Sequence, residues 1–79
     1  MAAKPKQPSW EERAKRYLKA ELKRADVTYE ELADRLAKHG LEETKASEAS
    51  KLSRGTFAAT FFLACLAALG VESLHLDDV

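Results

Sequence analysis

After residue 9, apolar residues recur every three or four positions, which is the spacing of one face of an α-helix. In the segment SWEE, Ser9 and Glu12 have the spacing of a capping box, in which each side chain binds the backbone amide of the other residue. The pattern predicts a helix over residues 9–25. Its predicted inner face comprises Trp10, Ala14, Tyr17, Leu18, Leu22 and Ala25.

The segment TYEELADRLAKHG repeats the same arrangement in a shorter form. Thr28 and Glu31 form a second capping box, and Gly40 is a natural C-terminal stop. A helix is therefore predicted over 28–39. Its inner stripe is expected to consist of Leu32, Ala33, Leu36 and Ala37.

A third helix is predicted over 44–53, because Thr44 can cap its start and Gly55 can end it. Leu52 is its one large apolar residue, so the helix buries little by itself. Either Ala46 or Ala49 is expected to point inward together with Leu52.

The fourth helix is predicted to start at Thr56, and it is apolar almost all round. A helix without a polar face is typical of the middle of a bundle or of an interface. The apolar stretch 57–69 is too short to cross a bilayer, which needs ~20 residues. Beyond Gly70, the short apolar run 71–76 predicts either a helical turn or a short strand. Such a strand could pair with its copy in a dimer.

These elements predict an all-α fold: a four-helix bundle in the order of a helix-turn-helix protein, with a short C-terminal strand or turn. Residues 9–79 form the predicted domain, and residues 1–8, with two prolines and two lysines, form a flexible basic arm. A core this small is often supported by an additional device. With one cysteine and no zinc-site spacing, oligomerisation remains, so a homodimer is expected.

The net charge is zero, but it is unevenly distributed along the chain. Residues 1–24 carry a charge of +5 and residues 25–50 carry −4. A neutral total is unusual for a nucleic-acid-binding protein, whose footprint is usually basic, although a local basic surface remains available. No secretory signal or membrane span is evident, so a cytoplasmic location is expected.

Catalytic chemistry is not predicted. The chain has no glycine-rich phosphate loop, no recognisable pair of catalytic carboxylates and no nucleophile with a neighbouring base. Cys65 lies in the apolar helix and is expected to be a small buried residue. No metal or cofactor is expected.

Three segments carry a resemblance to known regulators. VTYEELADRL resembles the start of the helix-turn-helix in lambda-repressor-like proteins of the Cro and xenobiotic-response-element group. KLSRG resembles the end of their recognition helix, and FFLACLAALGVESLHL is similar to the core helix that follows. The stretch AKHGLEET is longer than its counterpart in that family, which leaves the angle of the third helix open. The chain also resembles a group of short, functionally uncharacterised bacterial proteins.

The resemblance implies a DNA-binding surface on the helices at 28–39 and 44–53. In the family pattern, the start of the second helix meets the DNA backbone, the start of the third reads bases, and its later residues face the groove or phosphates. The residues that fall at these positions are Thr28, Tyr29, Lys45, Ala46, Ser47, Ser50, Lys51 and Arg54.

Two functions remain open from the sequence. The first is a bacterial or phage transcriptional regulator that binds double-stranded DNA as a dimer. The helix order and KLSRG favour it, but Ala46 and Ser47 offer few of the paired hydrogen bonds that read bases. The second is a protein-interaction module on the same bundle, antitoxin-like or a phage-encoded inhibitor, which the acidic segment 25–50 favours.

Overall fold

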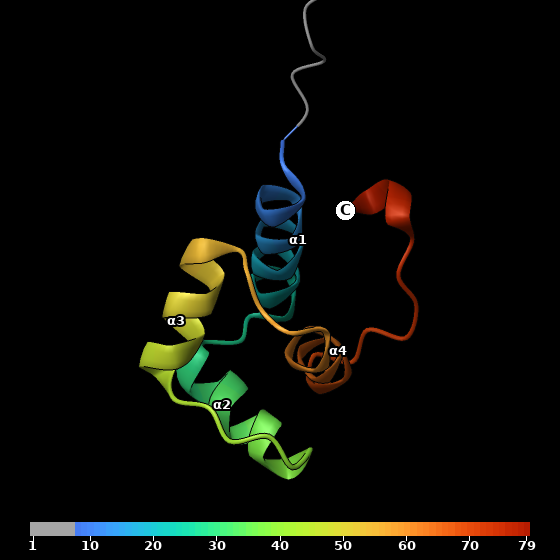
Figure 1. Ribbon diagram of the computed structural model, residues 1–79. Coiled ribbons are helices and arrows are strands. Elements are labelled where there is room, and N and C mark those ends of the chain that lie inside the picture. The colour runs from blue at the N-terminus through green and yellow to red at the C-terminus, as the bar shows by residue number, and fades with distance from the viewer. Residues whose placement is uncertain (1–7) are drawn as a thin grey trace, which may run out of the picture.

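The computed structural model describes residues 8–79 as four helices followed by a short 3-10 turn (Figure 1). These elements are α1 (Trp10–Ala25), α2 (Tyr29–Lys38), α3 (Lys45–Arg54), α4 (Ala59–Ala68) and η1 (Leu76–Asp78). The all-α prediction is confirmed, and no strand occurs within residues 8–79. For residues 71–76 either a helical turn or a short strand was predicted; residues 71–75 form neither, and only Leu76 belongs to the 3-10 turn η1. The predicted basic arm lies outside the described residues, except for Pro8.

The first three helices begin where their capping residues predicted. The Ser9 side chain accepts a hydrogen bond from the Glu12 amide at 3.1 Å. Thr28 and Glu31 form a reciprocal capping box at the start of α2. Thr44 caps α3, with Ser47 as its reciprocal partner. These caps satisfy backbone amides that a helix start would otherwise leave without a hydrogen-bond partner. Residues close together in the sequence therefore determine each start.

The predicted start of α4 at Thr56 is wrong, because the helix begins at Ala59 after an Ala58 N-cap that makes no side-chain hydrogen bond. Gly55 ends α3 in the left-handed conformation, and residues 56–58 then turn the chain toward α4. Within this turn Phe57 stacks on Phe62, with ring centroids 5.9 Å apart. Packing of an aromatic residue thus replaces a capping hydroxyl in fixing the entry to α4.

The core consists of apolar residues from all four helices and of Val27 between α1 and α2. Buried apolar side chains are Leu18, Leu22, Val27, Leu32, Leu36, Leu52, Phe61, Cys65, Leu66 and Ala68. Two residues predicted on the inner face of α1 are exposed: Trp10, at 63%, and Ala25. The Trp10 ring packs instead under the guanidinium of Arg13, which lies 4.0 Å from the ring centroid.

The apolar helix α4 is only partly covered. Phe61 and Cys65 face the core, whereas Leu63 is 61% exposed and Ala67 is exposed too. The helix packs against α1 and α2 and presents its other side to solvent, so it does not occupy the middle of the bundle. Its role in a dimer interface stays a prediction. None of the described helices has the length and hydrophobicity needed to cross a membrane.

The helix α3 packs against both α1 and α2. Figure 1 shows α3 running antiparallel to α1, so that the end of α3 lies near the start of α1. A Cβ atom on Gly55 would lie 2.3 Å from the carbonyl oxygen of Glu11, which shows how closely the two backbones approach. Nearby, the Lys15 ammonium donates a hydrogen bond to the Ser53 carbonyl at 3.2 Å. These contacts fix which side of α3 faces outward.

Candidate nucleic-acid interface

The exposed face of α3 is rich in small residues. Glu48 and Leu52 are both 0% exposed, and this pair, one turn apart, defines the buried side of the helix. The exposed face consists of Lys45, Ala46, Ala49, Ser50, Ser53 and Arg54. The prediction that Ala46 or Ala49 points inward is therefore wrong. Position 48 lies one helical turn before Leu52 and is buried like it, although its residue is a glutamate.

A line of lysines on α1 meets this face through one of its members. Lys15, Lys19 and Lys23 are spaced four residues apart and therefore share one side of the helix. Lys15 reaches the Ser53 carbonyl of α3 and pairs with Glu12 of its own helix at 3.4 Å, whereas Lys19 and Lys23 are exposed. We call these three residues the basic flank. The sequence analysis did not include them in the candidate site, because nothing in the sequence says that α3 lies beside α1.

The opposite side of α3 borders an acidic cleft of ≈ 660 Å³ between α2 and α3. The lining residues are Ala33, Asp34, Ala37, Glu42, Glu43, Thr44, Ser47 and Lys51. Three of these carry a negative charge and one carries a positive charge. The name acidic cleft refers to these eight residues below. The two sides of α3 thus have opposite electrostatic character.

Lys51, a predicted phosphate ligand, is bound within the protein. Its ammonium forms an ion pair with Glu43, whose side chain is only 8% exposed, and lies 4.7 Å from the ring centroid of Phe61. Burial raises the pKa of Glu43, but hydrogen bonds from Lys51 and Ser47 outweigh it and hold that pKa below its usual value. Much of the positive charge of Lys51 is therefore offset by Glu43.

The two predicted hydroxyl ligands at helix starts serve as caps. The Ser47 hydroxyl accepts a hydrogen bond from the Thr44 amide at 2.9 Å and also donates to Glu43. The Thr28 hydroxyl accepts from the Glu31 amide at 3.1 Å. Tyr29, next to Thr28, is half-buried against the core.

The remaining predicted residues lie together on the exposed face of α3. Lys45, Ala46, Ser50 and Arg54 are all exposed, and Arg54 donates a hydrogen bond to the Ser50 hydroxyl at 2.9 Å. The predicted set is therefore divided. Four members share the exposed face with the basic flank beside it, and Ser47 and Lys51 belong to the acidic cleft.

Glu48 is a buried residue that the sequence analysis did not assign to the core. Neither of its carboxylate oxygens has a hydrogen-bond partner within residues 8–79. Burial, with a smaller effect from the Glu43 charge, raises the pKa of Glu48 to about 7. Burial also raises the pKa of the Cys65 thiol to about 12, with Glu48 contributing. The spacing of four residues between Glu48 and Leu52 was the feature of the sequence that could have predicted the burial of Glu48.

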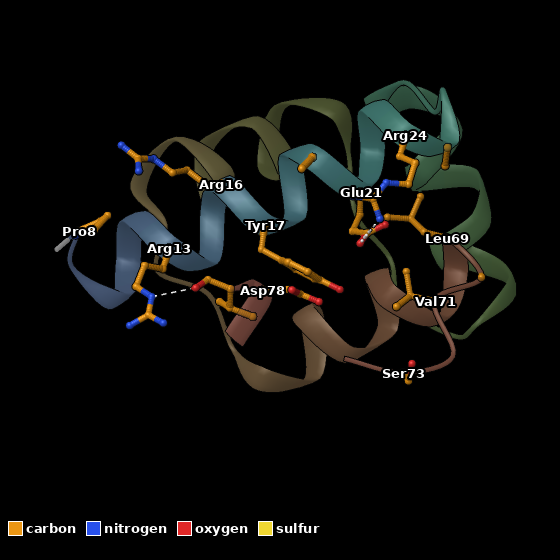
Figure 2. Close-up of a pocket in the computed structure, with 14 residues that line it drawn as sticks. Pro8, Arg13, Arg16, Tyr17, Glu21, Arg24, Leu69, Val71, Ser73 and Asp78 are labelled. Atoms are coloured by element: carbon orange, nitrogen blue, oxygen red, sulfur yellow. Dashed lines mark hydrogen bonds and ion pairs between the residues drawn. The ribbon is translucent and has the colours of Figure 1, made fainter. Parts of the chain in front are cut away.

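A second hollow, of ≈ 890 Å³, lies between α1 and the C-terminal segment (Figure 2). Two of the arginines that line it have partners within the protein. Arg13 donates a hydrogen bond to the Val79 carbonyl at 3.0 Å, and Arg24 forms an ion pair with Glu21 at 3.0 Å. Burial raises the pKa of Tyr17, and a hydrogen bond to Glu21 raises it further. The hydrogen bond from Arg13 to Val79 thus attaches the C-terminal segment to α1, whereas Tyr17, Glu21 and Arg24 interact within α1.

Comparison with known proteins identifies a family without a described activity. Residues 10–74 match the family described as Domain of unknown function (DUF6471), and the chain belongs to this family. No curated protein and no solved structure matches the chain. Within residues 8–79, no three or more His, Cys, Asp or Glu side chains are grouped so that they could hold a metal ion.

Proposed function

We propose that this member of the DUF6471 family is a helix-turn-helix transcriptional regulator that binds double-stranded DNA through the exposed face of α3. The observation that carries the proposal is the contact between the basic flank and α3, in which Lys15 donates a hydrogen bond to the carbonyl of Ser53 on the exposed face. Lysines beside a protruding helix can bind phosphates while the helix approaches the bases. The resemblance of VTYEELADRL and KLSRG to lambda-repressor-like proteins supports the same assignment.

The small side chains of α3 suit close approach to a DNA groove. The short side chains of Ala46 and Ala49 allow the helix backbone to come close to a ligand, and alanine can contact the methyl group of thymine. Ser50 can bind a base edge or a phosphate, whereas Lys45 and Arg54 supply positive charge near the two ends of the helix. Base reading by this set is limited. The proposed complex therefore depends mainly on phosphate contacts and on DNA shape.

A small number of phosphate contacts gives weak, salt-dependent binding by one chain. Pairing of two copies would double those contacts, which is the physical reason for proposing a homodimer. We place this regulator in the cytoplasm, where DNA and an unpaired cysteine such as Cys65 are both compatible with the environment.

Fluorescence anisotropy with a randomised duplex tests the proposal. We expect micromolar or tighter binding at low salt, weakening steeply between ~50 and ~200 mM salt. Replacing Lys45 and Arg54 by alanine should weaken binding to all sequences and reduce the salt slope by roughly 2. Lys38→Ala is the matched control, since this exposed lysine ends α2. No binding at low salt, or equal loss in the control, would contradict the proposal.

The acidic cleft favours a second candidate function, a protein-interaction module that accepts a basic segment of a partner. Asp34 and Glu42 would supply the attraction, because Glu43 is already paired with Lys51. Replacing both by their neutral amides, Asp34→Asn and Glu42→Gln, should abolish binding of such a partner. The same double variant should bind DNA at least as well as the wild type, so it distinguishes the two functions.

A further inference from the structure

Glu48 is an ionisable residue in an apolar site. Its side chain is 0% exposed, and neither oxygen accepts a hydrogen bond from any residue that the structure describes. It projects from the same side of α3 as Leu52, which is also 0% exposed. Burying an ionised carboxylate without a partner is costly, whereas a protonated carboxyl group is far cheaper to bury.

The surroundings of Glu48 offer its negative charge little compensation. Glu43 repels it, and the nearest cation, Lys51, is already paired with Glu43. The helix α4 contributes no charged residue, because its sequence is ATFFLACLAA. The charged or titratable groups that act on Glu48 are Glu43 before α3, Lys51 of α3 and Cys65 of α4. On the neighbouring helices, Lys15 of α1 lies at the Ser53 carbonyl and Asp34 of α2 lines the acidic cleft.

We propose that Glu48 is a pH-sensitive lock on α3, which holds this helix in the bundle when its carboxyl group is protonated and weakens that attachment when it ionises. The buried site, the absence of hydrogen-bond partners among the described residues and the neighbouring Glu43 carboxylate together support this role. Glu48 and Leu52 are the two buried residues of α3, so ionisation acts on one of the two side chains that the helix buries.

The direction of the effect follows from the pKa of Glu48, which burial raises from 4.5 to about 7. A raised pKa means that the folded state binds the proton more tightly than the unfolded state. The resulting stabilisation is complete below the unfolded value and is lost as the pH rises through the folded value. The folding equilibrium constant should fall on the order of 50-fold between about pH 5 and about pH 8. Above pH ~5 the opposite contribution of Glu43 is already complete, because its pKa lies below 4.5.

Equilibrium unfolding across this pH range tests the lock directly. The stability of the wild type relative to Glu48→Gln should decrease as the pH rises, because the glutamine side chain is neutral at every pH. Glu42→Gln is the matched control, since Glu42 lies beside the same helix outside the buried site and should follow the wild-type curve. Parallel curves for the wild type and Glu48→Gln would overturn the proposal.

A measurement on the wild type covers the case in which Glu48→Gln fails to fold. The side-chain carboxyl carbon of Glu48 should titrate by NMR with a midpoint near the raised pKa of about 7, well above the ordinary glutamate value of 4.5. A midpoint near that ordinary value would equally overturn the lock. Neither readout involves DNA, so the lock and the proposed DNA-binding function can fail independently. If both hold, DNA binding should weaken toward alkaline pH in the wild type and not in Glu48→Gln.

Discussion

The two sides of α3 differ in charge and in how their charges are used. On the side of α1, Lys19 and Lys23 of the basic flank are exposed to solvent. On the side of α2, the acidic cleft contains Lys51, but Glu43 pairs with it. A sequence with zero net charge therefore builds a more basic surface on one side of α3 and a more acidic one on the other. The neighbours of a helix thus contribute to the charge on each of its sides.

The contact that seats α3 beside the basic flank should be the most sensitive to substitution. Gly55→Ala places a Cβ 2.3 Å from the Glu11 carbonyl oxygen at a φ of +72°. The expected loss of stability is roughly 3 kcal/mol or more. Gly40→Ala, on the side of the acidic cleft, has the same kind of φ but open space, and should cost about 1 kcal/mol. Denaturant unfolding measures both. Equal costs would show that the α1–α3 contact is not tight.

Removing charge from the basic flank should give the largest effect on DNA. Lys19→Ala/Lys23→Ala should reduce affinity for every duplex by roughly 10- to 100-fold at low salt and lower the salt slope by about 2. Both lysines are exposed, so the fold should be unaffected. Anisotropy titrations over a salt series measure both quantities. Unchanged affinity in a folded variant would remove α1 from the interface.

Breaking the ion pair in the acidic cleft should affect stability. Lys51→Ala leaves Glu43 largely buried without its cation, at an expected cost of about 1–2 kcal/mol near neutral pH. The pKa of Glu43 is lowered in the folded state, so its stabilisation is present above the unfolded value of 4.5 and is lost as the pH falls through the folded value. The variant should therefore lose less stability than the wild type on acidification. Acid-unfolding curves that fall by the same amount would refute this.

Neutralising the unpaired acids of the cleft should have the smallest effect. Asp34→Asn/Glu42→Gln removes two charges that repel phosphates at a distance, so DNA affinity should rise a few fold at low salt and little at high salt. Sequence preference should not change. A decrease in affinity would place the cleft inside the DNA interface.

The starts of the first three helices could be predicted from the sequence because a cap is formed by residues that lie close together in the chain. Ser9, Thr28 and Thr44 each lie three residues before the group that completes the cap. The start of α4 was missed because a polar cap was expected at Thr56, whereas Phe57 and Phe62 flank the Ala58 N-cap as a hydrophobic staple. A local signal was also missed at the site. Glu48 was overlooked as a buried residue because its polarity outweighed its spacing from Leu52.

Only part of the candidate face could be predicted from the sequence. Lys45, Ala46, Ser50 and Arg54 share one side of α3 by helical spacing alone. Pairing of Lys51 with Glu43 and approach of Lys15 to the Ser53 carbonyl are tertiary contacts, and they decide which lysines remain available to a ligand. Local periodicity predicts faces, whereas neighbouring helices determine their charge.

The most direct test of DNA binding by the basic side of α3 is an NMR titration of the labelled protein with a short duplex at low salt. We expect amide shifts along α1 from Lys15 to Lys23 and along the exposed face of α3, with little change at Asp34 and Glu42. This result would place phosphates on the basic flank. Shifts confined to the acidic cleft, or none at any DNA concentration, would contradict the proposed function.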